Sequence, residues 1–214
     1  MRQHALHSSR AIYDSRRKMA TPSVSGAWHL SPSYRYRFDE SLARGIMALI
    51  HDSNRSATLL DMGAGKGHYV KFWKDHGIDV HGVEGADNIE AVRHIPLVMH
   101  ADLSKPLSPC VPYDWVTCLE VGEHVPREFE STIFANINCS ARQHAIVSWA
   151  VPGQLGNGHV NTRAKAYVDK QMGQLGFVYD RATSASLRRL SKYAWFRRNI
   201  VVFHRSHSPP LSAK

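Results

Sequence analysis

Residues 59–67 read LLDMGAGKG, an apolar run that enters a glycine-rich turn. A strand that leads through glycines into a helix brings backbone amides close to a bound ligand. The third small residue of a dinucleotide-binding turn is missing, because His68 occupies that position. Lys66 is followed by Gly67 rather than by Ser or Thr, which excludes a phosphate-cradling P-loop. Asp61 stands two residues before the first glycine, where a carboxylate repels phosphate and attracts a cation.

A second acid favours ligand binding over the alternative, an ordinary strand, turn and helix without a ligand. Residues 78–84 read IDVHGVE and alternate apolar with polar residues, as a half-buried strand does. This strand ends on Glu84, 21 residues after Gly63. An acid at that distance, at the end of a second strand, accepts hydrogen bonds from the ribose hydroxyls of a nucleoside. The two acids together predict a cationic ligand that contains a nucleoside.

These residues resemble motif I and the following acidic residue of the class I methyltransferases that use S-adenosylmethionine. The resemblance implies a cofactor with a sulfonium and an ammonium group. It also implies that Asp102, in the segment HADLS, holds the adenine edge together with the backbone of Leu103. A helix N-cap is the alternative role for Asp102. The predicted cofactor-binding residues are Asp61, Gly63, Gly65, Gly67, Glu84, Asp102, Leu103 and Glu120.

The composition predicts a single soluble domain. The chain has 214 residues, of which 43% are hydrophobic, and this is enough for one full core. Its apolar runs are much shorter than a membrane span. Cys110, Cys118 and Cys139 show no C-x-x-C pairing, so we expect three reduced thiols and a cytoplasmic location.

Basic residues concentrate at the two ends of the chain. Residues 1–20 contain five basic residues and one acid, and residues 181–214 contain eight basic residues and no acid. Basic ends favour a polyanion such as a nucleic acid, and a solvated basic face is the alternative. The first end also has the bias of an organelle transit peptide. We expect a flexible basic arm over 1–25, one methyltransferase-like domain over 26–205 and a disordered tail over 206–214.

Helical and strand-like patterns alternate along the chain. A helix is expected from Asp39 or Glu40 to Ile50, before the first strand. The alternation predicts an α/β fold with a doubly wound, mostly parallel sheet and helices on both faces. The resemblance adds a C-terminal antiparallel hairpin and a total of seven strands. The expected strands are 57–62, 78–84, 97–101, 113–119, 143–149, the segment FVYD after Gly176 and 199–204, with helices at 67–76, 87–95, 126–138 and 162–175.

A second cluster of functional residue types follows the strand 113–119, where residues 120–126 read EVGEHVP. If Glu120 opens a helical turn, it shares one face with Glu123 and His124. The glycine-rich loop VPGQLGNGHVN, residues 151–161, presents His159 as a fourth ligand. Two carboxylates and two imidazoles suit a divalent metal, and we name Mg²⁺ or Mn²⁺ as candidates, with Fe, Co or Zn as alternatives.

The E-x-x-E-H pattern resembles the metal site of the small-RNA 2′-O-methyltransferases and the E-V-x-E-H-V segment of the ubiquinone-biosynthesis O-methyltransferases. It implies O-methylation of a hydroxyl on a small-molecule or sugar acceptor, with catalytic roles for Glu123, His124 and His159. A metal would lower the pKa of that hydroxyl. A metal-free histidine acting as general base and a structural role are the alternatives. RNA 2′-O-methylation, and a non-catalytic RNA-binding protein on the same fold, are the alternative functions.

Trp28 precedes the first expected helix, in a region that closes over the cofactor in this type of fold. We therefore expect a lid role for Trp28.

Overall fold

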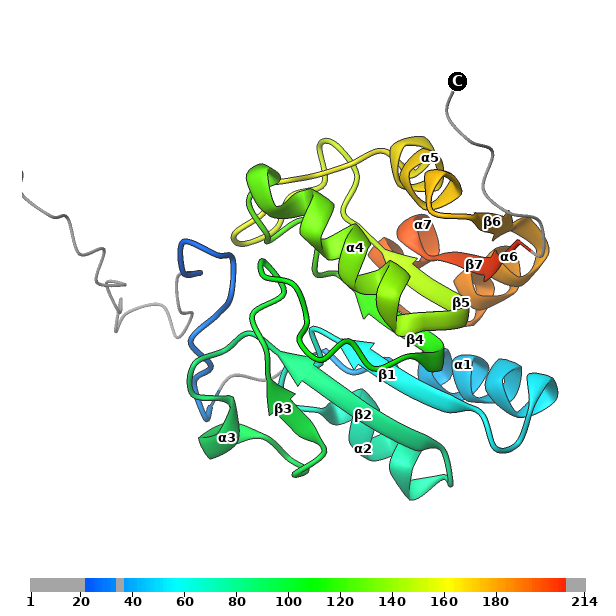
Figure 1. Cartoon of the computed structure of the whole chain (residues 1–214), viewed down its shortest axis with the longest axis horizontal. Coiled ribbons are helices and arrows are strands. Elements are labelled where there is room, and N and C mark those ends of the chain that lie inside the picture. The colour runs from blue at the N-terminus through cyan, green and yellow to red at the C-terminus, as the bar shows by residue number, and fades with distance from the viewer. Residues whose placement is uncertain (1–21, 34–36, 207–214) are drawn as a thin grey trace, which may run out of the picture.

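The computed structural model describes residues 22–33 and 37–206, and within them a seven-stranded sheet forms the middle layer (Figure 1). The strand order is β3-β2-β1-β4-β5-β7-β6. Strand β7 pairs antiparallel with both neighbours, and the other pairs are parallel. The predicted α/β fold is confirmed. The strands are β1 Thr58–Met62, β2 Asp79–Glu84, β3 Val98–His100, β4 Tyr113–Leu119, β5 Ala141–Ser148, β6 Phe177–Asp180 and β7 Val201–Arg205.

Helices pack on both faces of the sheet, because successive strand residues point to opposite faces. Leu59 and Trp115 belong to a core shared with α1, α2, α3, α6 and α7, whereas Leu60 and Val116 belong to a core shared with α4 and α5 (Figure 1). The helices are α1 Glu40–Ser53, α2 His68–Asp75, α3 Ile89–Val92, the 3₁₀ turn η1 Arg127–Phe129, α4 Glu130–Ser140, α5 Lys165–Gln174, α6 Arg181–Leu190 and α7 Ala194–Asn199.

The sequence prediction missed α6 and α7. Their buried positions include Ser184 and Asn199 beside Leu187 and Phe196, so the apolar period is interrupted. Strands β6 and β7 pair antiparallel, as expected. They are joined by α6 and α7 rather than by a short turn. The helix expected over 87–95 is only the short α3, because Arg93 takes an extended conformation.

The expectation of three reduced thiols was wrong. Cys110 and Cys139 form a disulfide, with their Cα atoms 6.1 Å apart, and only Cys118 is free and buried. The bond joins the connection between β3 and β4 to the last turn of α4, two segments separated by 29 residues. No local spacing announces a pair that tertiary packing brings together. The cysteines therefore give no argument for a reducing compartment.

The expected basic arm and tail lie almost entirely outside the described residues, which include only residues 22–25 of the arm and Ser206 of the tail. In the part of the chain that the structure covers, every helix is too short or too polar to cross a lipid bilayer.

Asp39 joins the start of α1 to the connection between α6 and α7. One carboxylate oxygen accepts from the Leu42 amide at 3.1 Å and caps the helix. The other accepts from the Ser191 hydroxyl at 2.6 Å and the Lys192 amide at 2.9 Å. The Asp39 side chain is fully buried, so water cannot replace its carboxylate as the acceptor for these donors. One carboxylate therefore fastens segments more than 150 residues apart.

Replacing Asp39 by Ala should lower the free energy of unfolding by about 2–4 kcal/mol, because a cap is lost and buried donors lose their acceptor. Urea unfolding followed by circular dichroism measures this change. Glu40→Ala is the matched control, since the adjacent Glu40 makes only an exposed ion pair with Arg44. We expect about 0.5 kcal/mol or less for Glu40→Ala. Equal losses in the two variants would contradict this role of Asp39.

Candidate functional site

Asp61 lies in β1, immediately before the glycine turn, and is almost completely buried. Its carboxylate accepts a hydrogen bond of 2.7 Å from the Thr117 hydroxyl on the neighbouring β4. Burial raises the pKa of Asp61 to about 7; the nearby Glu84 adds to this effect, and the Thr117 hydroxyl opposes it. The Asp61 carboxylate therefore changes its charge within the physiological pH range.

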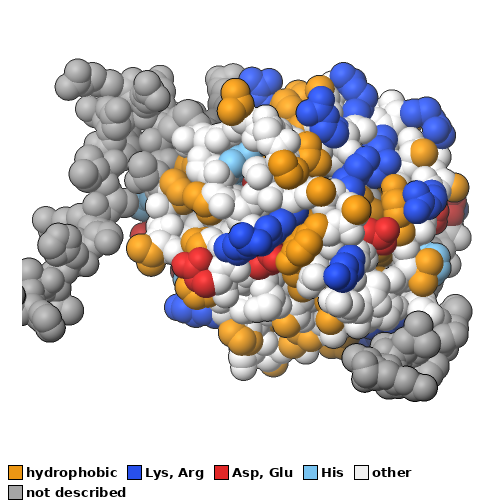
Figure 2. All heavy atoms as spheres, turned by 90° about the horizontal axis from the view of Figure 1, so that it is seen from above, with side chains coloured by type: hydrophobic (Ala, Val, Ile, Leu, Met, Phe, Trp, Pro, Cys, Tyr) orange, Lys and Arg blue, Asp and Glu red, His pale blue; other side chains and the backbone are white. Residues whose placement is uncertain are grey.

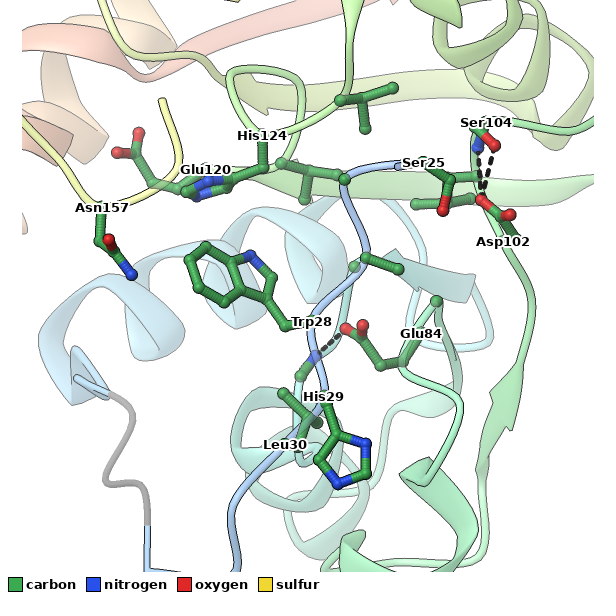
Figure 3. A pocket seen from close by; sticks show the side chains of 18 of the residues that line it. Ser25, Trp28, His29, Leu30, Glu84, Asp102, Ser104, Glu120, His124 and Asn157 are labelled. Carbon is green, nitrogen blue, oxygen red and sulfur yellow. Dashed lines mark hydrogen bonds between the residues drawn. The ribbon is translucent and has the colours of Figure 1, made fainter. Parts of the chain in front are cut away.

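Glu84 ends β2 on the other side of the glycine turn. Its carboxylate accepts from the Gly65 amide at 2.7 Å (Figure 3). It also accepts from the Ala86 amide at 3.0 Å. Burial raises its pKa, and these amides oppose the shift only in part. Asp61 and Glu84, which the sequence places 23 residues apart, thus flank the same turn, as adjacent parallel strands dictate.

Asp102 follows β3 and accepts from the amide and the hydroxyl of Ser104, at 3.0 and 2.8 Å (Figure 3). These bonds close a turn, and no helix begins there, so Asp102 is not the helix N-cap that the sequence left as an alternative. The same residue also lines the cavity described next, together with Leu103. The turn thus holds Asp102 at the cavity wall, and its contact with the cofactor stays a prediction.

A cavity of about 320 Å³ opens at the carboxyl edge of the sheet. Of the predicted site residues, Asp61, Gly67 and Glu123 lie outside its wall. The structure brings the others together at one cavity, so the predicted cofactor half and acceptor half share a common space. The predicted residues in the wall are Gly63, Gly65, Glu84, Asp102, Leu103, Glu120, His124 and His159.

The segment from Ser25 to Ser31 crosses this cavity, and from it the sequence analysis had singled out only Trp28. The Trp28 ring meets the His124 ring edge-on, with centroids 5.4 Å apart (Figure 3). The Asn88 side chain fixes the segment by accepting from the Leu30 amide at 2.9 Å and donating to its carbonyl at 2.7 Å. These contacts support the expected lid role of Trp28.

The EVGEHVP segment does not form the expected turn. Glu120 has a left-handed φ of 54° and precedes the turn instead of opening it. The turn is closed by the His124 amide, which donates to the Val121 carbonyl at 3.0 Å. Glu120 therefore does not belong to the cluster that Glu123 and His124 form with His159, although its carboxylate lies close enough to Glu123 to raise the pKa of that group.

Glu123, His124 and His159 form a compact cluster whose ligand atoms all lie within 4.8 Å of one another. The Nδ1 of His124 faces the Gly158 carbonyl at 3.2 Å, and the Nδ1 of His159 faces the Gln154 carbonyl at 3.1 Å. A carbonyl only accepts, so both Nδ1 atoms carry hydrogen, and in a neutral imidazole the Nε2 atom then keeps its lone pair. Burial, chiefly, lowers the pKa of His124 to about 4, which leaves this imidazole neutral.

The Glu123 carboxyl group is the most unusual member of the cluster. It is fully buried, and neither of its oxygens has a hydrogen-bond partner among the described residues. One oxygen lies 4.0 Å from the Nε2 of His159, too far for a hydrogen bond. Burial raises the pKa of Glu123 well above its ordinary value, and the negative charge of Glu120 raises it further. When Glu123 is ionised, the cluster presents acceptors to one another without a donor.

Two residues that the sequence analysis missed lie against Glu120. The side-chain amides of Gln154 and Asn199 each lie 3.4 Å from its carboxylate, and Asn199 donates to the Gln154 side chain at 2.9 Å. Gln154 stands in the glycine-rich loop, where its neighbours were a usable signal. Asn199 ends α7, a helix that the sequence did not predict, so no signal was present.

The fold and the site define a class I methyltransferase that uses S-adenosylmethionine as methyl donor. The chain belongs to the family described as methyltransferase domain, whose model matches residues 34–148. No curated protein matches the chain in sequence.

Solved structures show the same fold at low sequence identity. Magnesium protoporphyrin IX methyltransferase from Synechocystis PCC 6803, solved with bound S-adenosylmethionine, is 22% identical and has a TM-score of 0.58, with 77% of this chain and 78% of that chain covered. The methyltransferase domain of bacterial CtHen1-C is 16% identical, with a TM-score of 0.59 and coverage of 78% and 98%. The sugar N-methyltransferase KedS8 from a Streptoalloteichus species is 13% identical, with a TM-score of 0.61 and coverage of 85% and 99%.

Gly26→Ala should displace the segment over the cavity. Gly26 has a φ of +88°, and a Cβ there would lie 2.3 Å from the His124 carbonyl oxygen. Gly77 is the matched control, because its φ is +87° but a Cβ there would meet nothing within 4 Å. Both Ala variants should lose about 1–2 kcal/mol of stability. Only Gly26→Ala should also lower the affinity for S-adenosylmethionine, measured by calorimetry, by about tenfold or more. Equal affinities in the two variants would argue against the lid.

The affinity for S-adenosylmethionine should rise with pH between 6 and 8. The pKa of Asp61 is about 7, so Asp61 is mostly neutral at pH 6 and mostly ionised at pH 8. Only the ionised form attracts the cationic cofactor, which predicts an increase of about tenfold across this range. Calorimetry at several pH values measures it, and Asp61→Asn should flatten the profile. A slope that survives in Asp61→Asn would assign the titration to Glu84 instead.

Proposed function

We propose that this methyltransferase transfers the methyl group to a hydroxyl oxygen of a small-molecule or sugar acceptor, with the help of a divalent cation. Glu123, His124 and His159 hold that cation, and Glu120 is its neighbour. Asp61, Glu84 and Asp102 bind the cofactor around the glycine turn. One cavity is lined by Glu84 and Asp102 from the first set and by His124 and His159 from the second, which supports the placement of donor and acceptor side by side.

The observation that carries the proposal is the set of acceptors at Glu123. Two imidazole lone pairs and a buried carboxyl group without a hydrogen-bond donor converge within 4.8 Å. A buried charge requires a partner, and a cation is the partner that suits all three groups at once. One carboxylate and two imidazoles favour a transition metal such as Mn²⁺ over Mg²⁺, which prefers oxygen ligands.

When bound, the cation would lower the pKa of the acceptor hydroxyl. The residues of the chain then orient the reaction. The wall that carries Glu120, His124 and Trp28 holds the acceptor across from the glycine turn, so that its oxygen approaches the methyl carbon from the side opposite the sulfur. The new oxygen–carbon bond forms as the sulfur–carbon bond breaks. The hydroxyl proton passes to the nearest base, and His159 is the candidate in a metal-free route.

A screen of tritiated methyl transfer, with Mn²⁺ or with chelator, tests this function. The acceptors are phenols with adjacent hydroxyls, neutral sugars, amino sugars and RNA. We expect transfer to a hydroxyl acceptor that chelation abolishes. Glu123→Gln should weaken Mn²⁺ binding, measured by calorimetry, by about 100-fold or more, since loss of even an indirect partner of a metal costs about 10–100-fold.

Glu128→Gln is the matched control, because Glu128 is an exposed carboxylate five residues away. It should leave Mn²⁺ binding and transfer unchanged. Activity that survives both chelation and Glu123→Gln would eliminate the metal and leave a histidine as general base. Transfer to amino sugars alone would overturn O-methylation.

RNA is the alternative acceptor. The surface of α6 and α7 is the reason to include RNA in the screen. Residues 181–206 contain no acid, and basic side chains also outnumber acidic ones on the face seen in Figure 2. The rings of Tyr193 and Trp195 stack 4.5 Å apart, a platform of the kind that binds bases. RNA binding without transfer in any arm of the screen would favour the non-catalytic alternative. The exposed basic residues are Arg181, Arg189, Lys192, Arg197 and Arg198.

A further inference from the structure

Glu130, in the first turn of α4, lies outside the cavity and is nevertheless tied to the loop that carries His159. Its carboxylate is 6% exposed and accepts from three side chains. The side-chain amide of Asn161 donates to one oxygen at 3.0 Å, and the Arg163 guanidinium donates to the same oxygen at 2.5 Å. The Tyr167 hydroxyl donates to the second oxygen. All three donors belong to the segment that leaves the glycine-rich loop and enters α5.

The same segment is fastened directly to the E-x-x-E-H turn. The amides of Val160 and Asn161 both donate to the Glu123 carbonyl, at 2.8 and 3.0 Å. On the other side, the Trp149 indole donates to the Asn161 carbonyl at 2.6 Å. Asn161 is therefore held through its amide, its carbonyl and its side chain. His159 lies only two residues before it, so its position follows from that of Asn161.

Hydrogen bonds, rather than apolar packing, hold this loop in place. Leu155 is 95% exposed and Val160 is 60% exposed, so these large apolar side chains of the loop contribute little burial. A loop without apolar anchors depends on its polar contacts for a fixed position. The buried Glu130 carboxylate, with three donors, is the strongest acceptor among these contacts.

We propose that Glu130 is a positioning residue that holds residues 159–163 against the E-x-x-E-H turn, so that His159 faces Glu123. This inference rests on the proposed function insofar as Glu123 and His159 form the acceptor site. Glu130 itself does not line the cavity. It acts through Asn161 and Arg163, whose backbone continues the chain beyond His159.

The electrostatics of Glu130 fit this role. Burial alone would raise its pKa, but the bonds from Arg163, Tyr167 and Asn161 outweigh burial and hold the pKa below its usual value. The group is therefore a carboxylate throughout the working pH range and accepts from all three donors. Glu130→Gln removes the charge and turns an NH₂ group toward at least one donor, because an amide has only one accepting oxygen.

Hydrogen exchange of the Val160–Arg163 amides, measured in the full chain, tests the proposal. Glu130→Gln should accelerate exchange there by about tenfold or more, because the loop opens locally. The Mn²⁺ affinity should fall by about 10–100-fold, as for other residues that orient metal ligands. The affinity for S-adenosylmethionine should change by less than about twofold, since the predicted cofactor residues contact neither Glu130 nor its donors.

Asp114→Asn is the matched control. Asp114 also accepts from three donors, two on Thr58 and one on Arg142, and these bonds hold its pKa low despite burial. It lies near the start of β4, at the edge of the sheet opposite Glu120. A purely structural cost should therefore appear in Asp114→Asn as well, without any change in loop exchange or Mn²⁺ binding.

Loop exchange in Glu130→Gln that matches Asp114→Asn would overturn the proposal. If Glu130→Gln does not fold, Tyr167→Phe removes one donor and keeps the Arg163 pair, and it should give a smaller acceleration at the same amides. Unchanged exchange in Tyr167→Phe would then overturn it. A wild type that binds no Mn²⁺ would defeat the metal in the proposed function, whereas the exchange comparison would still decide the role of Glu130.

Discussion

The position of β4 between β1 and β5 is the constraint on which the site depends. Parallel pairing sets Met62 opposite Cys118, and Leu119 opposite Ser148, so these strands leave the sheet at nearly the same height. The glycine turn and the E-x-x-E-H segment are therefore neighbours before any side chain makes a contact. Their approach is close, since a Cβ on Gly63 would lie 2.3 Å from a methyl group of Val121. The glycine turn and the E-x-x-E-H segment face each other because the backbone register leaves them no other arrangement.

The parts of the site that could be predicted are those encoded locally. The alternation in residues 78–84 and the apolar run before Asp61 gave strands close to the observed ones, and the rule for parallel sheets placed their ends together. The parts that could not be predicted depend on contacts between distant segments. Asn88 holds a backbone 58 residues away, and Asn199 reaches Glu120 across 79 residues. Neither contact produces a periodic pattern in the sequence, and no pattern indicates the left-handed φ of Glu120.

Two groups of buried and half-buried acids differ in their surroundings. Asp61, Glu84 and Glu123 lie at the carboxyl edge of the sheet, and burial raises the pKa of each. Asp114 and Glu130 are matched with donors that hold the pKa of each below its usual value. The second group stabilises the fold. In the first group, burial makes ionisation of the carboxyl groups unfavourable, and these groups lie together at one edge of the sheet. Buried acids with raised pKa values beside a cavity are a physical signature of a functional site.

Strand β7 is the last strand of the described chain, yet it lies inside the sheet, between β5 and β6. Until it enters, β5 and β6 both present unpaired edges, the kind of surface that attracts foreign strands. The helix immediately before it carries Asn199, the residue that meets Glu120. During synthesis, the sheet can therefore be completed only after nearly the whole domain has left the ribosome. The contact between Asn199 and Glu120 forms in that same late step. A nascent chain thus contains the residues of the glycine turn well before it contains the strand that completes the sheet.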